Sequence, residues 1–246
     1  MLSFFQKKRY LIDLLNGFVD IHNHILPGID DGAKTVEESL ALIRGFSDFG
    51  INNFVCTPHI MHNYYNNTPE TIQASFSLLK KEMANQGLHD VSIDMAAEHM
   101  IDDNFEHILS QDRIMPLRKY HMLIEMSFLQ PSINFNQAIR QIISKNYFPI
   151  LAHPERYMFL QNNLPKYRSY KEKGILFQLN LLSLGDYYSK RVTATAGMLL
   201  ENDLIDFVGT DVHTMRQLDS LKNTAISNRT VKKLYPLING TIEQFY

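Results

Sequence analysis

The sequence predicts an α/β fold, a distorted TIM-like barrel in which seven parallel strands alternate with helices. Three observations favour it. About seven short apolar segments alternate with helical patterns, as expected for a parallel sheet. The length of 246 residues suits one α/β barrel, and no repeat or Pro/Gly/Ser-rich linker divides the chain. We therefore expect a single domain over 18–246, preceded by an N-terminal extension over 1–17.

The strands are expected where short apolar runs are bounded by polar or turn-forming residues. These runs span 18–22, 51–56, 91–97, 122–126, 149–152, 175–181 and 206–209. This number of strands in a chain of this length indicates a closed or nearly closed barrel rather than an open sheet.

The helices are expected between these strands. Thr35 and Glu38 form a capping-box pattern before a helix that stops at Gly50. Thr68, followed by Pro69 at the first helical position, opens a second helix that runs to about residue 86. Further helices are expected over 136–145, 166–173 and 188–201, with at least one more after residue 215.

Composition and charge argue against several classes of protein. A formal net charge of -2 gives no electrostatic case for nucleic-acid binding. The N-terminus lacks the pattern of a signal peptide, and no apolar run approaches the length of a membrane span. We therefore expect a cytoplasmic protein with no stable membrane insertion. Within the extension, apolar side chains are expected to pack on the barrel or on a neighbouring molecule: Phe4, Phe5, Tyr10, Leu11, Leu14 and Leu15.

The single cysteine does not fit the chemistry of cysteine-dependent phosphatases. Those enzymes need a thiolate followed six positions later by an arginine, and His62 stands at that distance from Cys56. Cys56 also lies in an apolar strand, which favours a small core residue. Neither a Gly-x-Ser-x-Gly elbow nor a Walker loop occurs in the sequence.

Histidines and carboxylates stand where the expected strands end, and these ends converge on one face of a barrel. A lone histidine after a strand is more often a hydrogen-bonded loop residue, but here the pairs at i and i+2 on extended backbone point the same way. Imidazole and carboxylate donors without thiolate suit zinc, manganese or iron. The donors exceed what one ion takes, which predicts two or three ions sharing a carboxylate. The candidates are His22, His24, His59, Glu98, Glu125, His153, Asp211 and His213.

Other polar residues near these positions have two interpretations each. Asp30 and Asp31 form either a turn or one more oxygen ligand, and Arg156 either binds a phosphate or forms an ordinary salt bridge with Glu155. The loop with Tyr64 and Tyr65 either flanks the mouth of the pocket or is plain surface. Histidines at 62 and 99 are near candidate ligands, and those at 89, 107 and 121 are expected to be structural or exposed.

The segment 20–34, DIHNHILPGIDDGAK, resembles the opening signature of the PHP (polymerase and histidinol phosphatase) superfamily. More narrowly, the chain resembles the bacterial CpsB/CapC family of metal-dependent protein-tyrosine phosphatases. Later motifs follow in order over about 19–213: TPH at 57–59, AE at 97–98, LIE at 123–125, AHPERY at 152–157 and GTDVH at 209–213.

This resemblance implies a PHP-type barrel with three divalent metal ions. Manganese is the first candidate for these ions, and iron and zinc are alternatives. The first ion would be held by His22, His24, Glu98 and Asp211. The second would be held by Glu98, Glu125 and His153, and the third by Asp31, preferred over Asp30, with His59 and His213.

The resemblance also implies roles in catalysis. Arg156 would bind the phosphoryl group, while Asp211 or His213 would assist the leaving group. The family carries a further arginine about five residues past the last histidine; here Arg216 comes three past it, as a candidate second phosphate contact. The family's Gly-Gln before Glu98 is Ala96-Ala97 here, and Thr210 replaces its serine.

The activity that the resemblance implies is hydrolysis of phosphotyrosine in a protein, namely the tail of a bacterial tyrosine autokinase of capsule or exopolysaccharide synthesis. One alternative keeps the site but changes the substrate to histidinol phosphate, another small phosphomonoester or a nucleic acid. A second alternative is a non-catalytic, metal-stabilised binding or regulatory protein, because a fold does not fix a function.

Overall fold

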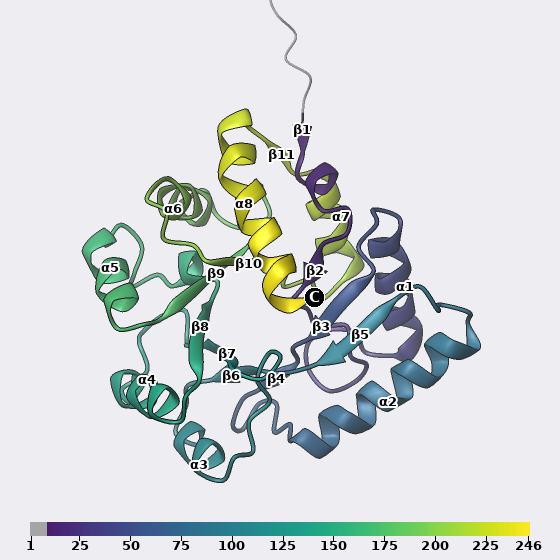
Figure 1. Ribbon diagram of the computed structural model, residues 1–246, viewed down its shortest axis with the longest axis horizontal. Helices are drawn as coiled ribbons and strands as arrows, with labels where there is room; N and C mark the ends of the chain where they lie inside the picture. The colour runs from purple at the N-terminus through teal and green to yellow at the C-terminus, as the bar shows by residue number, and fades with distance from the viewer. Residues whose placement is uncertain (1–8) are drawn as a thin grey trace, which may run out of the picture.

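Parallel strands form the centre of the molecule and helices surround them in the computed structural model, which describes residues 9–246 (Figure 1). A six-stranded sheet has the order β10-β9-β8-β7-β6-β4, and a three-stranded sheet has the order β2-β3-β5. The strands of these sheets are β2 (Val19–Asp20), β3 (Asn53–Cys56), β4 (His59–Ile60), β5 (Ser92–Met95), β6 (Glu98–Met100), β7 (His121–Glu125), β8 (Phe148–Ala152), β9 (Leu176–Asn180) and β10 (Phe207–Gly209).

Two barrel strands are interrupted at their midpoints. Only Thr57 and Pro58 separate β3 from β4, and only Ala96 and Ala97 separate β5 from β6. In each case the first half pairs within the smaller sheet and the second half within the larger one. The nine short strands therefore trace seven barrel positions, which confirms the seven-stranded α/β barrel and its distortion.

Backbone contacts between the first and last strands bring the two sheets together. Asn23 forms a parallel bridge with Val212, and the Asp211 amide donates to the His22 carbonyl at 2.7 Å. The Thr210 hydroxyl donates to the buried Asp20 carboxylate at 2.6 Å. Thr210 thus adds a side-chain contact to the backbone contacts that close the barrel.

Helices cover the outside of the strands (Figure 1). Thr35 caps the first of them by accepting from the Glu38 amide, as expected, whereas the Glu38 carboxylate accepts from the Lys34 amide rather than from that of Thr35. The sequence did not indicate the short α3. The helices are α1 (Val36–Ser47), α2 (Pro69–Asn85), α3 (Phe105–Ser110), α4 (Phe135–Ser144), α5 (Leu164–Glu172), α6 (Lys190–Glu201), α7 (Met215–Asn223) and α8 (Asn228–Phe245).

The core has two parts. A larger cluster packs the helices against the outer faces of the strands. A smaller cluster fills the inside of the barrel with side chains such as Val19, Val55, Leu123 and Ile150, and Phe245 at the end of α8 belongs to it. Because Phe245 also packs on residues that begin β7 and β10, α8 closes the amino ends of the strands. The carboxyl ends remain available for a site.

Residues before the barrel pack against it. Strand β1 (Arg9–Tyr10) pairs antiparallel with β11 (Ala225–Ile226), and Leu11 and Leu15 are fully buried. The expected packing of the extension is therefore seen for these leucines, while Phe4 and Phe5 lie outside the described residues. Across 9–246, no helix combines the length and the apolar character that a bilayer crossing demands.

Candidate metal centre

Three overlapping groups of histidines and carboxylates meet at the carboxyl ends of the strands. The first contains His22, His24, Glu98 and Asp211, all of them buried. His22 Nε2 lies 3.2 Å from Glu98 Oε2 and 3.3 Å from Asp211 Oδ1, and the matching distances from His24 Nε2 are 3.5 and 3.4 Å. The structure thus brings together the four residues expected at the first ion.

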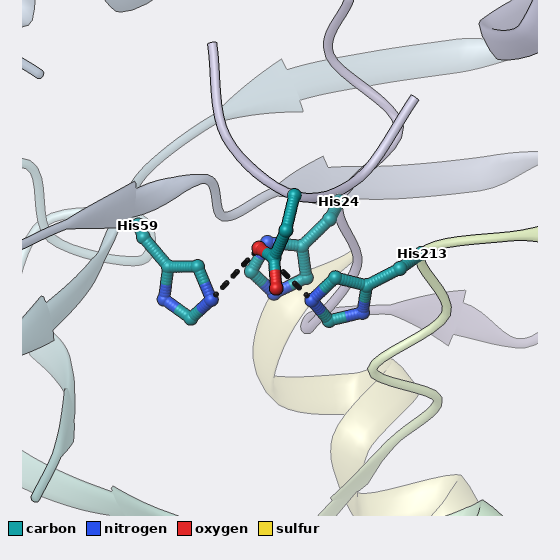
Figure 2. Close-up of side chains that lie close together, drawn as sticks. His24, His59 and His213 are labelled. Carbon is teal, nitrogen blue, oxygen red and sulfur yellow. Dashed lines mark ion pairs between the residues drawn. The ribbon is translucent and has the colours of Figure 1, made fainter. Parts of the chain in front are cut away.

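The second group lies at the mouth of the site and contains His24, Asp31, His59 and His213. Figure 2 shows the three imidazoles pointing toward one another from separate segments of the chain, and His59 is the first residue of β4. Asp31 Oδ1 is 3.4 Å from His59 Nε2 and 3.5 Å from His213 Nε2. These are the residues expected at the third ion, with His24 added.

The third group differs from the expected one. His59, rather than His153, forms a close set with Glu98 and Glu125, because His59 Nδ1 lies 3.1 Å from Glu98 Oε2 and 2.9 Å from Glu125 Oε1. His153 adjoins this set, with Nε2 3.0 Å from Glu98 Oε1 and 3.9 Å from Glu125 Oε2. His59 begins β4 directly after the interruption of the second barrel strand, and its place in the sequence did not reveal its contact with Glu125.

The donor atoms of these groups fit bound cations. Several of them are buried and have no hydrogen-bond partner within the described chain: His22 Nε2, His24 Nε2, His59 Nδ1, Glu98 Oε2 and Glu125 Oε1. An unsatisfied buried polar atom costs about 1–3 kcal/mol. Divalent ions would satisfy all of these atoms at once, since imidazole nitrogen and carboxylate oxygen are their usual ligands.

The electrostatics of the cluster agree with this fit. Burial favours the neutral form of His22, but Glu98 and Asp211 outweigh it and raise the pKa of His22. Burial likewise opposes the charged form of Glu98, but His22 and His59 hold the pKa of this carboxyl well below its usual range. Metal ions compete with protons for such ligands, because bound histidines must be neutral.

Buried partners fix the orientation of the imidazoles. Gln178 Oε1 lies 2.7 Å from His22 Nδ1, and Asp30 Oδ2 lies 2.8 Å from His24 Nδ1. Asp30 also accepts from the Gly32 and His59 amides. Asp31 therefore faces the cluster while Asp30 orients it from behind. Gln178 was not among the residues predicted from the sequence, although a glutamine inside an apolar strand was an available signal.

Two of the candidate ligands have strained backbone. His153 and Asp211 have φ values of 35° and 53°, in the left-handed region that residues other than glycine rarely adopt. Such conformations cost about 1–3 kcal/mol each and concentrate at functional sites.

Gly32→Ala is expected to destabilise the fold by about 1–3 kcal/mol, as for an overpacked core. A Cβ at Gly32 would lie 2.0 Å from the His24 carbonyl oxygen and 2.5 Å from the His24 Cβ. Urea unfolding measures the effect. Gly87→Ala is a partial control, because its added Cβ meets nothing within 4 Å although its φ is +70°. A loss at position 32 no larger than that at 87 would contradict the crowding argument.

Arg156 lies beside the cluster, and its salt bridge differs from the expected one. Its Nη1 donates to Asp211 Oδ2 at 2.7 Å. Glu155 instead points into the protein, where it accepts from the Asn180 amide at 3.0 Å and the Ser183 hydroxyl at 2.7 Å. Burial raises the pKa of Glu155 to about 7. The adjacency of residues 155 and 156 did not reveal this. Both lie in a 3-10 turn (Pro154–Arg156), and their side chains leave it in different directions.

A cavity of about 680 Å³ opens above the cluster. Polar residues of the cluster and Arg156 line one part of it. Tyr64 and Tyr65 both line its mouth, and the Tyr65 ring stacks on His59 with centroids 5.4 Å apart. The other walls are mainly apolar and are formed by Met61, Met100, Met126, Phe128 and Leu129.

The remaining candidates lie away from the cluster. Arg216 does not line this cavity; it is exposed and borders a separate depression with Glu38, Met215 and the outer side of the loop that carries His213, so the geometry does not support it as a phosphate contact. His99 is buried, with Nδ1 against the Leu123 carbonyl. Cys56 is buried as expected, and burial raises the pKa of its thiol.

The protein is a distorted parallel barrel in which histidines and carboxylates that could bind metal lie beside an arginine. This arrangement places it in the class of PHP-type barrels. The sequence model for "Capsular polysaccharide synthesis, CpsB/CapC" matches residues 18–234, and the chain belongs to this family.

Known proteins agree with this assignment. The chain is 30% identical over 200 residues to tyrosine-protein phosphatase YwqE of Bacillus subtilis, covering 80% of this chain and 78% of the relative. It is 26% identical over 220 residues to the putative tyrosine-protein phosphatase CapC of Staphylococcus aureus, covering 88% and 85%. Solved structures of YwqE from Bacillus subtilis and CpsB from Streptococcus pneumoniae are described as metal-dependent tyrosine phosphatases. The match to them has a TM-score of 0.82 and 27% identity, and covers 92% of this chain and 93% of theirs.

Proposed function

We propose that this protein hydrolyses phosphotyrosine in proteins, with divalent metal ions bound in the histidine–carboxylate cluster. The observation that carries the proposal is the sharing of Glu98 and His59 among adjacent donor groups, directly beside Arg156 at the base of a cavity. The names of YwqE and CapC as tyrosine-protein phosphatases support the same reaction.

Three ions would use the ligands that meet here, with manganese as the first candidate and iron or zinc as alternatives. One would lie among His22, His24, Glu98 and Asp211. The others would lie among His24, Asp31, His59 and His213, and around Glu98 and Glu125 with His59 or His153. Bound ions would supply positive charge for the phosphate oxygens and lower the pKa of bound water.

The protein's own side chains would bind and orient the phosphate ester. Arg156 would donate to the phosphoryl oxygens and offset negative charge in the transition state. Asp211 and His213 are the candidates for holding the proton that the leaving tyrosine oxygen takes. The apolar wall with Met126 and Leu129 would contact the phenyl ring.

The distance of the phosphate from the peptide backbone of the substrate provides a test of this proposal. The phosphate of phosphotyrosine lies at the end of a long aromatic side chain, whereas that of phosphoserine lies close to the backbone. We expect kcat/KM for a phosphotyrosyl peptide to exceed that for the matched phosphoseryl peptide by about a hundredfold, because only the phenyl ring can contact the apolar wall of the cavity. Steady-state kinetics with both peptides and with histidinol phosphate measure this. Faster turnover of histidinol phosphate would overturn the substrate assignment.

Metal removal provides an independent check. Dialysis against a chelator is expected to abolish turnover, because the ions would supply the charge that binds the phosphate and activates water. Addition of manganese is expected to restore turnover. Elemental analysis of the purified protein gives the identity and number of ions. Full activity in protein shown to be free of divalent ions would contradict the proposal.

The physiological substrate that we propose is the phosphorylated tail of a tyrosine autokinase in the cytoplasm. The description of the family as one of capsular polysaccharide synthesis supports this choice. This choice is tested by incubating such a phosphorylated kinase with and without the phosphatase. Anti-phosphotyrosine blotting then measures the loss of phosphate from the kinase.

A further inference from the structure

Arg156 is flanked by two aromatic rings that come from different parts of the chain. Its Cζ lies 4.3 Å from the ring centroid of Phe128, which follows β7, and 4.6 Å from that of Tyr188, which precedes α6. The arginine side chain is 20% exposed, so these contacts are largely shielded from water. A guanidinium attracts aromatic faces more strongly when it is desolvated.

A hydrogen bond to Asp211 further restrains the guanidinium, and Asn180 links Asp211 to Tyr188. Asp211 Oδ2 accepts from Arg156 at 2.7 Å and from Asn180 Nδ2 at 2.8 Å. The same Asn180 amide donates to the Tyr188 hydroxyl at 3.2 Å. Tyr188 therefore contacts Arg156 through its ring and the arginine's partner, Asp211, through its hydroxyl and Asn180.

The arrangement leaves donors for a ligand. Within residues 9–246 the guanidinium makes this one hydrogen bond, to Asp211, although it carries five N–H groups. Arg156 also lines the cavity above the cluster. An arginine free to rotate could turn all its donors toward the neighbouring carboxylates, whereas the two rings keep the guanidinium edge available.

We propose that Phe128 and Tyr188 are positioning residues that hold Arg156 ready to bind the phosphoryl group. This inference rests on the proposed function for the identity of the substrate, but it concerns the binding of the phosphate group itself. Because a preorganised side chain need not be ordered when the ligand binds, loss of either ring should weaken phosphate affinity.

Inorganic phosphate binding to the metal-loaded protein, measured by calorimetry, tests the proposal. Phosphate has no ring, so a change in its affinity cannot come from a lost contact between Phe128 and a tyrosine substrate. Phe128→Leu and Tyr188→Leu are each expected to weaken binding about two- to thirtyfold, the range of a cation–aromatic contact. Metal content is measured in parallel, because Phe128 also packs on His153.

Conservative variants separate the rings from other effects. Tyr188→Phe and Phe128→Tyr keep the aromatic faces and are expected to bind phosphate within about twofold of the wild type. In the Arg156→Ala background, Phe128→Leu and Tyr188→Leu are expected to change affinity by less than about twofold, because the group they position is gone.

Unchanged phosphate affinity in folded, metal-loaded leucine variants would overturn the proposal, and so would equal losses with and without Arg156. A Tyr188→Phe loss as large as that of Tyr188→Leu would also overturn it, since the hydroxyl rather than the ring would then matter. Should the wild type fail to hydrolyse phosphotyrosine, the proposed function falls while phosphate calorimetry still decides the role of the rings.

Discussion

Glu98→Gln is expected to reduce kcat by about a thousandfold or more, equivalent to several kcal/mol of lost transition-state stabilisation. Glu98 belongs to two of the three donor groups, and its Oε2 lies within 3.5 Å of nitrogens of His22, His24 and His59. The amide keeps the shape of the side chain but removes the charge that allows a carboxylate to bridge cations. The Glu98→Gln variant is also expected to bind less metal than the wild type.

The measurement combines steady-state kinetics on a phosphotyrosyl peptide with elemental analysis of the same preparation. Glu172→Gln is the matched control, because Glu172 is exposed on α5 and makes the same change of charge. We expect this control to retain wild-type turnover and metal content. A Glu98→Gln protein with wild-type metal content and rate would refute the role proposed for the cluster.

Arg156→Ala is expected to lower kcat/KM by about a hundred- to a thousandfold, the usual effect of removing one preorganised donor to a transition state. Arg156→Lys is expected to recover only part of this loss, because an ammonium lacks the planar fork and its contact with the two rings. Removal of Arg156 also leaves the buried Asp211 with one hydrogen-bond donor fewer. Circular dichroism and metal analysis therefore accompany the kinetics.

Arg216→Ala is the matched control for Arg156→Ala. Both changes remove one arginine, but Arg216 is exposed and lies outside the cavity that Arg156 lines. Its removal is expected to change kcat/KM by less than about twofold, as is usual for surface substitutions. Comparable losses at 156 and 216 would show that Arg216 reaches the phosphate, against the geometry.

The sequence alone determined the barrel and most of the cluster. Alternation of apolar segments with helical patterns is a local property, because each strand that is buried on both faces must be apolar along its length. The position of a ligand at the end of a strand is also local, so the pairs around His22 and Asp211 could be recognised before the strands were placed. Parallel order then required these ends to meet on one face.

The tertiary structure alone decided how the cluster is arranged. Two adjacent aspartates offered the same kind of ligand, and the contact of Asp30 with His24 Nδ1 decides that Asp31 faces the cluster. The break between β3 and β4 sets His59 against Glu125, which no spacing encodes.

Contacts between distant segments also lay beyond the sequence. Gln178 meets His22 from 156 positions away. Arg156 meets Phe128 and Tyr188 because three separate loops converge at the mouth of the barrel. Local patterns fix where a side chain leaves the backbone, but only the packing of the strands fixes which side chains it then meets.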